Sequence, residues 1–350
     1  MTDIEMVINL HVTERCNYRC TYCFGKWGLI QESSAETSVW ADTAAAYRIM
    51  SDLAEKFRRD RGADSPIRFN FVGGEPALLP NIDDLIDHAR TALKSRVSYV
   101  TNGLMLRRFD AAWTAENIDI VGISVDSALP STNREIGRVT RSGKVFDLAE
   151  IGTRVHAIRE AAHRRGARAP EIKVNTVVSD LNVNEKFGVV LNAIKPDRWK
   201  ILKMLPVYST ATAIADQSFR EFAKKHRKYV RKRAGSGRTD FNGVLITTED
   251  NDEMTGSYAM VDPLARFFWY DDRPESGYQY SAPMTEVSAD QAWAVAGVHW
   301  DEQKYGARYT ELMGSMDAAE TEAGQALVAP PVPRPRTIAE SSTSRTPVAI

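Results

Sequence analysis

Three cysteines, Cys16, Cys20 and Cys23, carry the clearest chemical signal in this sequence. The chain of 350 residues contains no other cysteine, and an odd number of thiols bunched so closely is not a disulfide framework. Thiolates gathered in this way usually hold a metal. Three ligands suit an iron–sulfur cubane that keeps one iron free to bind a substrate or cofactor. The alternative is a structural zinc site, although such sites usually take four protein ligands and the nearest histidine, His11, lies within a predicted strand.

Polar and apolar side chains alternate along four predicted strands. Because successive strand residues point to opposite faces and helices pack on the apolar faces, we expect the polar faces to look into the lumen of a barrel. Unpaired buried cations are costly and these strands offer few inward acids, with Asp126 as one candidate, so the lumen is expected to receive an anion such as a nucleoside triphosphate. Alternatively, some strands lie at an edge and expose these residues to solvent. The inward polar residues are Asn9, His11, Arg68, Asn70, Lys173, Asn175, Arg198 and Lys200.

Strand-like runs alternate with helix-like segments in the first part of the chain, which predicts a parallel sheet. An open sheet with helices on both faces and a curled partial barrel both fit this order, and the polar lumen favours the barrel. Gly62 and Gly166 stand where two helices are expected to end. The predicted strands are residues 7–13, 67–72, 97–101, 118–126, 171–178 and 198–205, and the predicted helices are 35–61, 82–93, 107–115, 145–165 and 185–194.

We therefore predict an α/β fold, a partial (βα)6 TIM-like barrel followed by a C-terminal extension. The barrel takes residues 1–206, and the extension takes 207–316 and covers the substrate site. In the extension, 219–229 looks helical, and 246–258 and 260–270 are either strands or an irregular cover. Residues 317–350 end in a stretch rich in Pro, Ser, Thr and Ala and are expected to form a disordered tail.

Composition excludes several classes of protein. The chain is 43% hydrophobic, as a packed globular protein is, and its net charge of −1 gives no bulk attraction to nucleic acid or membranes. It has no run of about 18 apolar residues that could span a bilayer. The N-terminus lacks the basic and apolar regions of a secretory signal. These features predict a cytoplasmic protein.

The spacing of the cysteines resembles that of the radical S-adenosylmethionine (radical SAM) superfamily, whose free iron chelates SAM. Gly73-Gly74-Glu75-Pro76 follows the second predicted strand as the family's GGEP segment does, and glycine lets backbone approach a ligand closely. From about Ile8 to Tyr309 the chain resembles the viperin family of these enzymes. The matching stretches are Asn9-Leu10-His11-Val12-Thr13, Cys16-Asn17-Tyr18-Arg19-Cys20, Ile136-Gly137-Arg138, Lys173-Val174-Asn175, Arg198-Trp199-Lys200 and Ser257-Tyr258.

The resemblance implies an enzyme that uses a [4Fe–4S] cluster and SAM to convert a nucleoside triphosphate, typically CTP, with UTP and GTP left open. In the family, a 5′-deoxyadenosyl radical removes the hydrogen from ribose C4′. Loss of the 3′-hydroxyl then gives a 3′-deoxy-3′,4′-didehydro nucleotide, a polymerase chain terminator in antiviral defence. The resemblance also implies an external one-electron donor of the flavodoxin or ferredoxin type. From the near-zero net charge we expect neither a nucleic acid nor a membrane as partner.

Matching positions imply roles for single residues. Cys16, Cys20 and Cys23 would hold the cluster, and Tyr258 matches a tyrosine near the sugar that is a candidate for the closing proton or electron step. The implied nucleotide-binding residues are Arg68, Asn70, Lys173, Asn175, Arg198 and Lys200. The implied SAM-binding residues are Tyr22 beside the adenine, Gly73, Gly74 and Glu75 at the amino group, Ser124 and Arg138 at the carboxylate, and Asn102 near the adenosine.

Two other functions remain open at this stage. One is a radical SAM enzyme that modifies a peptide or matures a cofactor, although many of these carry further cysteines for auxiliary clusters. The other is a non-catalytic, metal-stabilised nucleotide-binding protein. That protein would be colourless with zinc, whereas the enzyme should turn brown when reconstituted anaerobically with iron and sulfide.

Overall fold

The computed structural model describes residues 4–25, 38–145, 147–207, 210–229, 243–270 and 277–308. Contacts divide the chain into two units, Met1–Tyr309 and Thr310–Ile350. The second unit, and with it the predicted tail at 317–350, lies outside the described residues. The fold below is therefore that of the first unit.

Eight strands pair in parallel to form one sheet. They are β1 (Met6–His11), β2 (Ile67–Val72), β3 (Arg96–Thr101), β4 (Ile120–Ser124), β5 (Glu171–Val178), β6 (Arg198–Lys203), β7 (Leu245–Glu249) and β8 (Ala259–Val261). Their order across the sheet is β7-β6-β5-β4-β3-β2-β1-β8. The first six strands are neighbours in chain order, as repeated strand–helix–strand units require. This parallel half-barrel confirms the predicted fold class.

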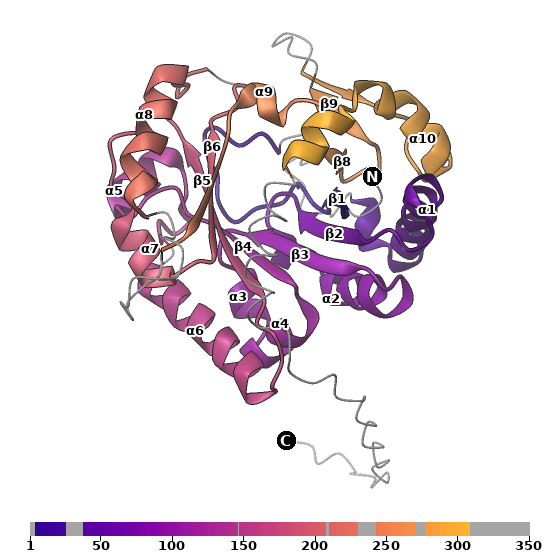
Figure 1. The fold of residues 1–350 in the computed structure, drawn as a ribbon, viewed down its shortest axis with the longest axis horizontal. Coiled ribbons are helices and arrows are strands. Elements are labelled where there is room, and N and C mark those ends of the chain that lie inside the picture. Colours follow the sequence, from indigo (N-terminus) through magenta and orange to yellow (C-terminus); the bar gives the residue numbers. More distant parts are fainter. Residues whose placement is uncertain are drawn as a thin grey trace, which may run out of the picture. The chain divides into compact units, whose positions relative to one another are not determined.

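Helices cover the outer side of the curved sheet (Figure 1). This arrangement leaves the concave side of the strands free to form a site. The helices are α1 (Thr43–Arg61), α2 (Ile82–Asp87), α3 (Met105–Arg108), α4 (Ala111–Asn117), α5 (Pro130–Ile136), α6 (Leu148–Arg164), α7 (Gly188–Ile194), α8 (Asp216–His226), α9 (Asn251–Met254) and α10 (Ala289–Ala296).

Local sequence located the first six strands, β1 to β6, to within two residues at either end, and β2 and β5 match the prediction residue for residue. The first helix starts later than predicted, because the Asp42 carboxylate accepts hydrogen bonds from the N–H groups of Ala44 and Ala45 and caps α1 there. The predicted helix at 107–115 is two short helices, since Asp110 caps α4 in the same way. Helix α5 was not predicted. It ends at Gly137, which adopts a left-handed φ of 86°.

The C-terminal extension contributes to the same sheet as the barrel. β7 pairs with β6, and β8 pairs with β1 at the opposite edge. Two further strands, β9 (Phe268–Tyr270) and β10 (Tyr278–Tyr280), form an antiparallel hairpin. The sheet thus continues past residue 206, and the division of the chain at that residue remains a prediction.

Apolar and polar side chains alternate along the strands and lie on opposite faces of the sheet, as predicted. Phe69, Phe71, Val174 and Trp199 are fully buried on the helix-covered face. Trp199, for example, packs its ring 5.2 Å from the ring of Phe187, just before α7. Burying each such side chain contributes about 1.5–3 kcal/mol, which fixes the register and turns the alternate, polar residues to the other face.

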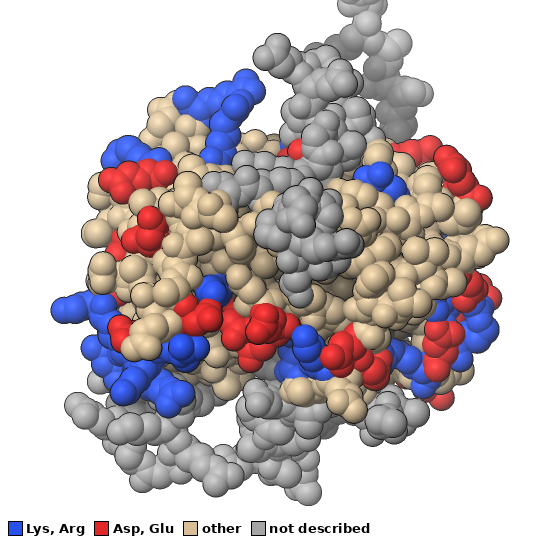
Figure 2. All heavy atoms as spheres, turned by 90° about the horizontal axis from the view of Figure 1, so that it is seen from above, with Lys and Arg blue, Asp and Glu red and all other residues tan. Residues whose placement is uncertain are grey.

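The surface carries charges of both signs. Figure 2 shows Lys and Arg side chains interspersed with Asp and Glu over the face seen from above. This mixture agrees with the near-zero net charge of the whole chain. Within the described ranges, no helix combines the length and apolar character that crossing a membrane would need.

Candidate active site

A cavity of about 1370 Å³ is lined by the polar face of the sheet and by the loops at its carboxyl ends. This exceeds the roughly 300–1,000 Å³ of most small-molecule sites, so two ligands fit. The predicted site residues that line it are Cys16, Cys20, Tyr22, Cys23, Asn70, Gly73, Gly74, Asn102, Ser124, Arg138, Lys173, Asn175, Lys200 and Tyr258. Arg68, Glu75 and Arg198 are not among its lining residues.

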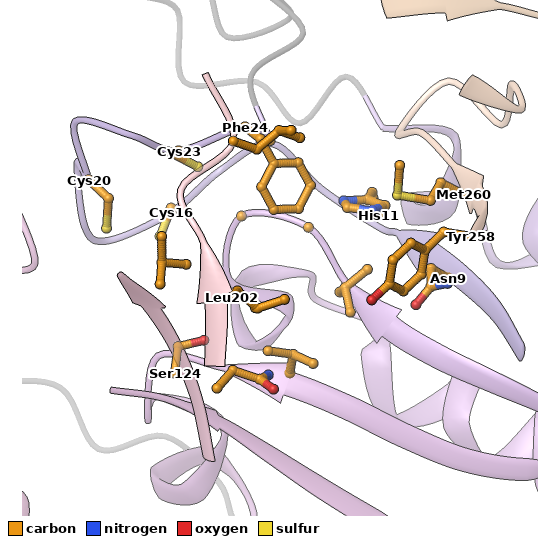
Figure 3. Close-up of a pocket in the computed structure, with 18 of the residues that line it drawn as sticks. Asn9, His11, Cys16, Cys20, Cys23, Phe24, Ser124, Leu202, Tyr258 and Met260 are labelled. Atoms are coloured by element: carbon orange, nitrogen blue, oxygen red, sulfur yellow. The ribbon is translucent and has the colours of Figure 1, made fainter. Parts of the chain in front are cut away.

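The three cysteines lie on the loop after β1 at one end of this cavity, and Tyr258 lies toward the other end (Figure 3). N–H groups lie near two of the three sulfurs. The Tyr18 N–H donates to Cys16 Sγ at 3.4 Å, and Asn102 Nδ2 lies 3.7 Å from the same sulfur. Arg138 Nη1 lies 4.0 Å from Cys20 Sγ. Hydrogen bonds to cysteine sulfur are a feature of iron–sulfur sites, where they tune the cluster.

Burial raises the pKa of the Cys16 thiol to about 11 and that of Cys20 to about 12, against the lowering effect of Arg138. As bare thiols they would keep their protons at neutral pH, whereas a metal ligand must be a thiolate. Three thiols on one cavity wall, with N–H donors around them, fit the three-cysteine [4Fe–4S] cluster that the radical SAM resemblance implies.

The glycines of the GGEP segment serve protein packing first. A Cβ on Gly74 would lie 2.2 Å from the carbonyl oxygen of Arg15, and one on Gly73 would lie 2.5 Å from that of Thr13. The N–H of Gly74 donates to the Thr13 carbonyl at 2.7 Å. We expected glycine here so that backbone could approach a ligand. The close approach in the structure is to the cysteine loop itself, which the two glycines hold in place.

Asp126 organises the wall beside the cluster loop. Its Oδ2 accepts a hydrogen bond from the Tyr22 hydroxyl at 2.6 Å and pairs with Arg138 Nη1 at 2.8 Å, while its Oδ1 accepts from the Val177 N–H at 2.7 Å. Arg138 also donates to the Ser124 carbonyl at 2.6 Å. The single inward acid named from sequence therefore fixes two of the residues that the resemblance assigns to SAM.

Glu75 lies behind the cavity wall and is fully buried. Its carboxylate accepts hydrogen bonds from the Thr101 hydroxyl at 2.8 Å and from the N–H groups of Asn102 at 2.8 Å and Ala77 at 3.2 Å. Burial nevertheless raises the pKa of Glu75 to about 7. In this arrangement Glu75 shapes the turn that carries Asn102 to the cluster loop.

Three of the four inward cations have carboxylate partners inside the protein. Arg68 Nε donates to Glu5 at 2.7 Å, and Arg198 Nε donates to Glu171 at 2.6 Å, both near the amino ends of their strands. Lys200 Nζ pairs with Glu249 at 2.5 Å and donates to the Tyr258 hydroxyl at 2.5 Å. The expectation that these cations lack carboxylate partners inside the protein was therefore wrong for these three. Two of the glutamates come from outside the predicted barrel strands.

Lys173 is different from the other three cations. Among the described residues, its ammonium group has no ion pair or hydrogen bond. Burial, together with Arg198, Lys200 and Arg68, lowers its pKa well below the usual value. The aliphatic part of its side chain passes Gly122 of β4. A Cβ added to Gly122 would lie 3.5 Å from Lys173 Cε and 2.9 Å from a backbone oxygen. The ammonium group thus borders the cavity without the anion that would stabilise its charge.

The polar side chains of Asn70 and Asn175 differ in whether other protein groups already satisfy their hydrogen bonds. Asn70 donates to Asn9 Oδ1 at 2.7 Å and accepts from the Ser98 hydroxyl at 2.7 Å, so both ends of its amide are bonded. Asn175 Oδ1 is buried and has no hydrogen-bond partner within the described ranges. Lys173 and Asn175 therefore both have bonding capacity left for a ligand.

Aromatic side chains that sequence reasoning did not single out form another part of the wall. The rings of Trp269 and His299 stack at 4.7 Å, and Tyr278 and Trp300 also line the cavity. They come from β9, β10 and the turn after α10, and no periodicity along the chain connects them. Sequence reasoning also missed Glu249 and Arg308, whose side chains contact Tyr258. Again, no periodicity along the chain connects them.

Comparison with known proteins agrees with this site. Residues 10–158 match the model of the radical SAM superfamily. The chain is 34% identical to a protein of Psychrobacter lutiphocae named S-adenosylmethionine-dependent nucleotide dehydratase, over 87% of this chain and 95% of that one. A protein of the same name from Pseudoalteromonas ulvae is 31% identical over 89% and 96%.

Solved structures show the same fold at low identity. Native anSMEcpe with bound AdoMet superposes with a TM-score of 0.56 at 15% identity, over 83% of this chain and 80% of that one. Streptococcus suis SuiB bound to S-adenosylmethionine gives 0.54 at 15% identity, over 87% and 67%. The relatives and the fold together confirm the predicted family. The chain belongs to the S-adenosylmethionine-dependent nucleotide dehydratases, the viperin-like enzymes of the radical SAM superfamily.

Proposed function

We propose that this enzyme converts a nucleoside triphosphate, with CTP as the first candidate and UTP and GTP as alternatives, into its 3′-deoxy-3′,4′-didehydro analogue. The name shared by the relatives, nucleotide dehydratase, supports a nucleotide substrate. The sugar chemistry, the base, and a role of the product as a chain terminator in antiviral defence extend the resemblance to the viperin family.

The side-chain amino group of Lys173, which has no ion-pair or hydrogen-bond partner among the described residues, is the observation that carries this proposal. It borders the same cavity as the three thiols, next to Lys200 and to the free Oδ1 of Asn175. A triphosphate supplies the missing anion, and charge-assisted bonds from lysine to phosphate are among the stronger polar contacts. Asn175 Oδ1 offers an acceptor for a ribose hydroxyl. Arg68 and Arg198 do not line the cavity and would attract the triphosphate through their positive charge, without contacting it.

The thiol end of the cavity would hold the cofactors. Cys16, Cys20 and Cys23 would bind the cluster, which when reduced supplies one electron to SAM. The Arg138 guanidinium and Ser124 would face the SAM carboxylate, and Tyr22, Gly73, Gly74 and Asn102 would contact the rest of SAM, with Glu75 supporting them. The electron would come from a flavodoxin- or ferredoxin-type donor in the cytoplasm, a reducing compartment that keeps free thiols available.

The electron and proton balance of the reaction gives Tyr258 a role. SAM bound at the thiol end would supply the radical chemistry that removes the C4′ hydrogen, with 5′-deoxyadenosine as the by-product. Expelling the 3′-hydroxyl as water then consumes one further electron and one proton. The Tyr258 hydroxyl borders the cavity beside Lys200, and a phenol can supply an electron by becoming a tyrosyl radical. The external donor would return that electron.

Anaerobic turnover with single nucleotides tests the proposal. The reconstituted, reduced enzyme is incubated with SAM and with CTP, UTP, GTP or no nucleotide, and both 5′-deoxyadenosine and the nucleotide products are quantified by mass spectrometry. We expect one triphosphate to accelerate SAM cleavage and to yield a product lighter by one water. Equal slow cleavage with and without every nucleotide would refute the proposal.

A further inference from the structure

Glu249, the last residue of β7, lies at the centre of a buried group of polar side chains behind one wall of the cavity. Its carboxylate pairs with Lys200 Nζ at 2.5 Å and with Arg308 Nε at 3.1 Å, and it accepts a hydrogen bond from the Tyr258 hydroxyl. Glu249 is 6% exposed. Lys200 and Tyr258 line the cavity, whereas Glu249 and Arg308 do not. Glu249 therefore meets the cavity through its two partners.

Arg308 holds the ring of Tyr258 in place. Its guanidinium carbon lies 3.8 Å from the ring centroid, within the range of a cation–π attraction. Its Nη1 donates to the Ser257 carbonyl at 2.7 Å, and its Nη2 donates to the Ser257 hydroxyl at 2.5 Å. The backbone and the ring at Tyr258 are thus attached to the cation that Glu249 neutralises.

Protonation states set the direction of the bonds at the Tyr258 hydroxyl. Burial alone would raise the pKa of Glu249, but Lys200 and Arg308 hold it below its usual value, so the side chain is ionised. An ionised carboxylate can only accept, and an ammonium group can only donate. The phenolic proton therefore lies toward Glu249, and the phenol oxygen accepts from Lys200.

We propose that Glu249 accepts the phenolic proton of Tyr258 at the moment Tyr258 gives its electron to the substrate radical. The O–H bond of Tyr258 breaks, the electron goes to the sugar, and the proton forms an O–H bond on Glu249. Lys200 releases one proton to the departing 3′-hydroxide, which leaves as water. The external donor then reduces the tyrosyl radical, Glu249 returns its proton, and solvent reprotonates Lys200. One electron and one proton are consumed, as the reaction requires.

This inference rests on the proposed nucleotide dehydration and is tested by the amount of dehydrated nucleotide formed per 5′-deoxyadenosine. Glu249→Gln keeps the shape and the hydrogen bond but cannot take the proton. Glu249→Asp keeps the charge but withdraws the carboxylate from Tyr258 by roughly 1.5 Å, one C–C bond. We expect each variant to lower the ratio of dehydrated nucleotide to 5′-deoxyadenosine at least fivefold, toward that of Tyr258→Phe.

Controls separate this role from a structural one. Iron content, melting temperature and CTP affinity are measured for every variant, and Glu150→Gln, an ion-paired glutamate on α6, serves as the matched charge change. If the Gln variant loses iron because Arg308 no longer faces a negative charge, the proposal is judged on the Asp variant, which keeps that charge. Freeze-quench electron paramagnetic resonance adds a second readout, since both variants should form less tyrosyl radical than the wild type.

The outcomes are distinct for the two proposals. A wild-type enzyme that forms no dehydrated nucleotide overturns the proposed function and this inference with it. A productive wild-type enzyme whose Glu249→Gln and Glu249→Asp variants keep the wild-type ratio and radical yield overturns the inference alone.

Discussion

Replacing Lys173 with methionine is expected to weaken CTP binding by about 10- to 100-fold while leaving the iron content unchanged. Methionine has a similar length and fills the same path beside Gly122 without the charge. A hydrogen bond to a charged group contributes about 1.5–3 kcal/mol, and each 1.4 kcal/mol is a factor of ten in affinity. Lys200 keeps its own charge, so binding should weaken rather than vanish.

Proton uptake makes this prediction sharper. Burial lowers the pKa of Lys173 well below its usual value and that of Lys200 to about 8, and a bound polyanion should raise both again. At pH 8 the triphosphate is fully ionised. Lys200 is then about half protonated, so binding should take up about half a proton through Lys200 and a further share through Lys173, whose pKa is also lowered.

Calorimetry in two buffers of different ionisation enthalpy measures both the CTP affinity and the proton uptake on binding. The apparent binding enthalpy of the wild type should depend on the buffer, and Lys173→Met should lose the share of that dependence that Lys173 contributes, along with affinity. Lys224→Met, on the exposed face of α8, is the control and should match the wild type. A Lys173→Met variant with wild-type affinity and wild-type proton uptake would refute the reasoning, and a simultaneous loss of iron would mean that Lys173 supports the fold.

Two further predictions concern the support of the cluster loop. Gly137→Ala should destabilise the protein by about 2 kcal/mol or more, because its φ is 86° and the new Cβ would lie 2.2 Å from the Arg19 carbonyl; an unchanged melting temperature would contradict this. Glu75 has its pKa raised by burial to about 7 in the fold, so its contribution to stability is fully present below the ordinary pKa of 4.5 and declines as the pH rises through 7. Urea unfolding of the metal-free protein should show a loss of about 3 kcal/mol from this group between pH 4.5 and 8 that is absent in Glu75→Gln, and identical pH dependence in the two proteins would argue against it.

Much of the site follows from local patterns in the sequence. The cysteine spacing places Cys16, Cys20 and Cys23 on one loop, and alternation along β5 puts Lys173 and Asn175 on the face opposite Val174. Both patterns depend on neighbouring residues and on the burial of apolar side chains, so they can be recognised without knowing the fold. The relation of Gly74 to Arg15, by contrast, needs two loops to be brought together in space.

The sequence by itself determined the grouping of the three cysteines on one loop, the six barrel strands and the polar character of the lumen. Only the tertiary structure decided which cations are already neutralised, because Glu5, Glu171 and Glu249 reach their partners through strand order and register rather than through proximity along the chain. That pairing leaves Lys173 as the cation that still lacks an anion among the described residues. Coulomb energy depends on distances across the sheet, and a sequence does not contain those distances until it is folded.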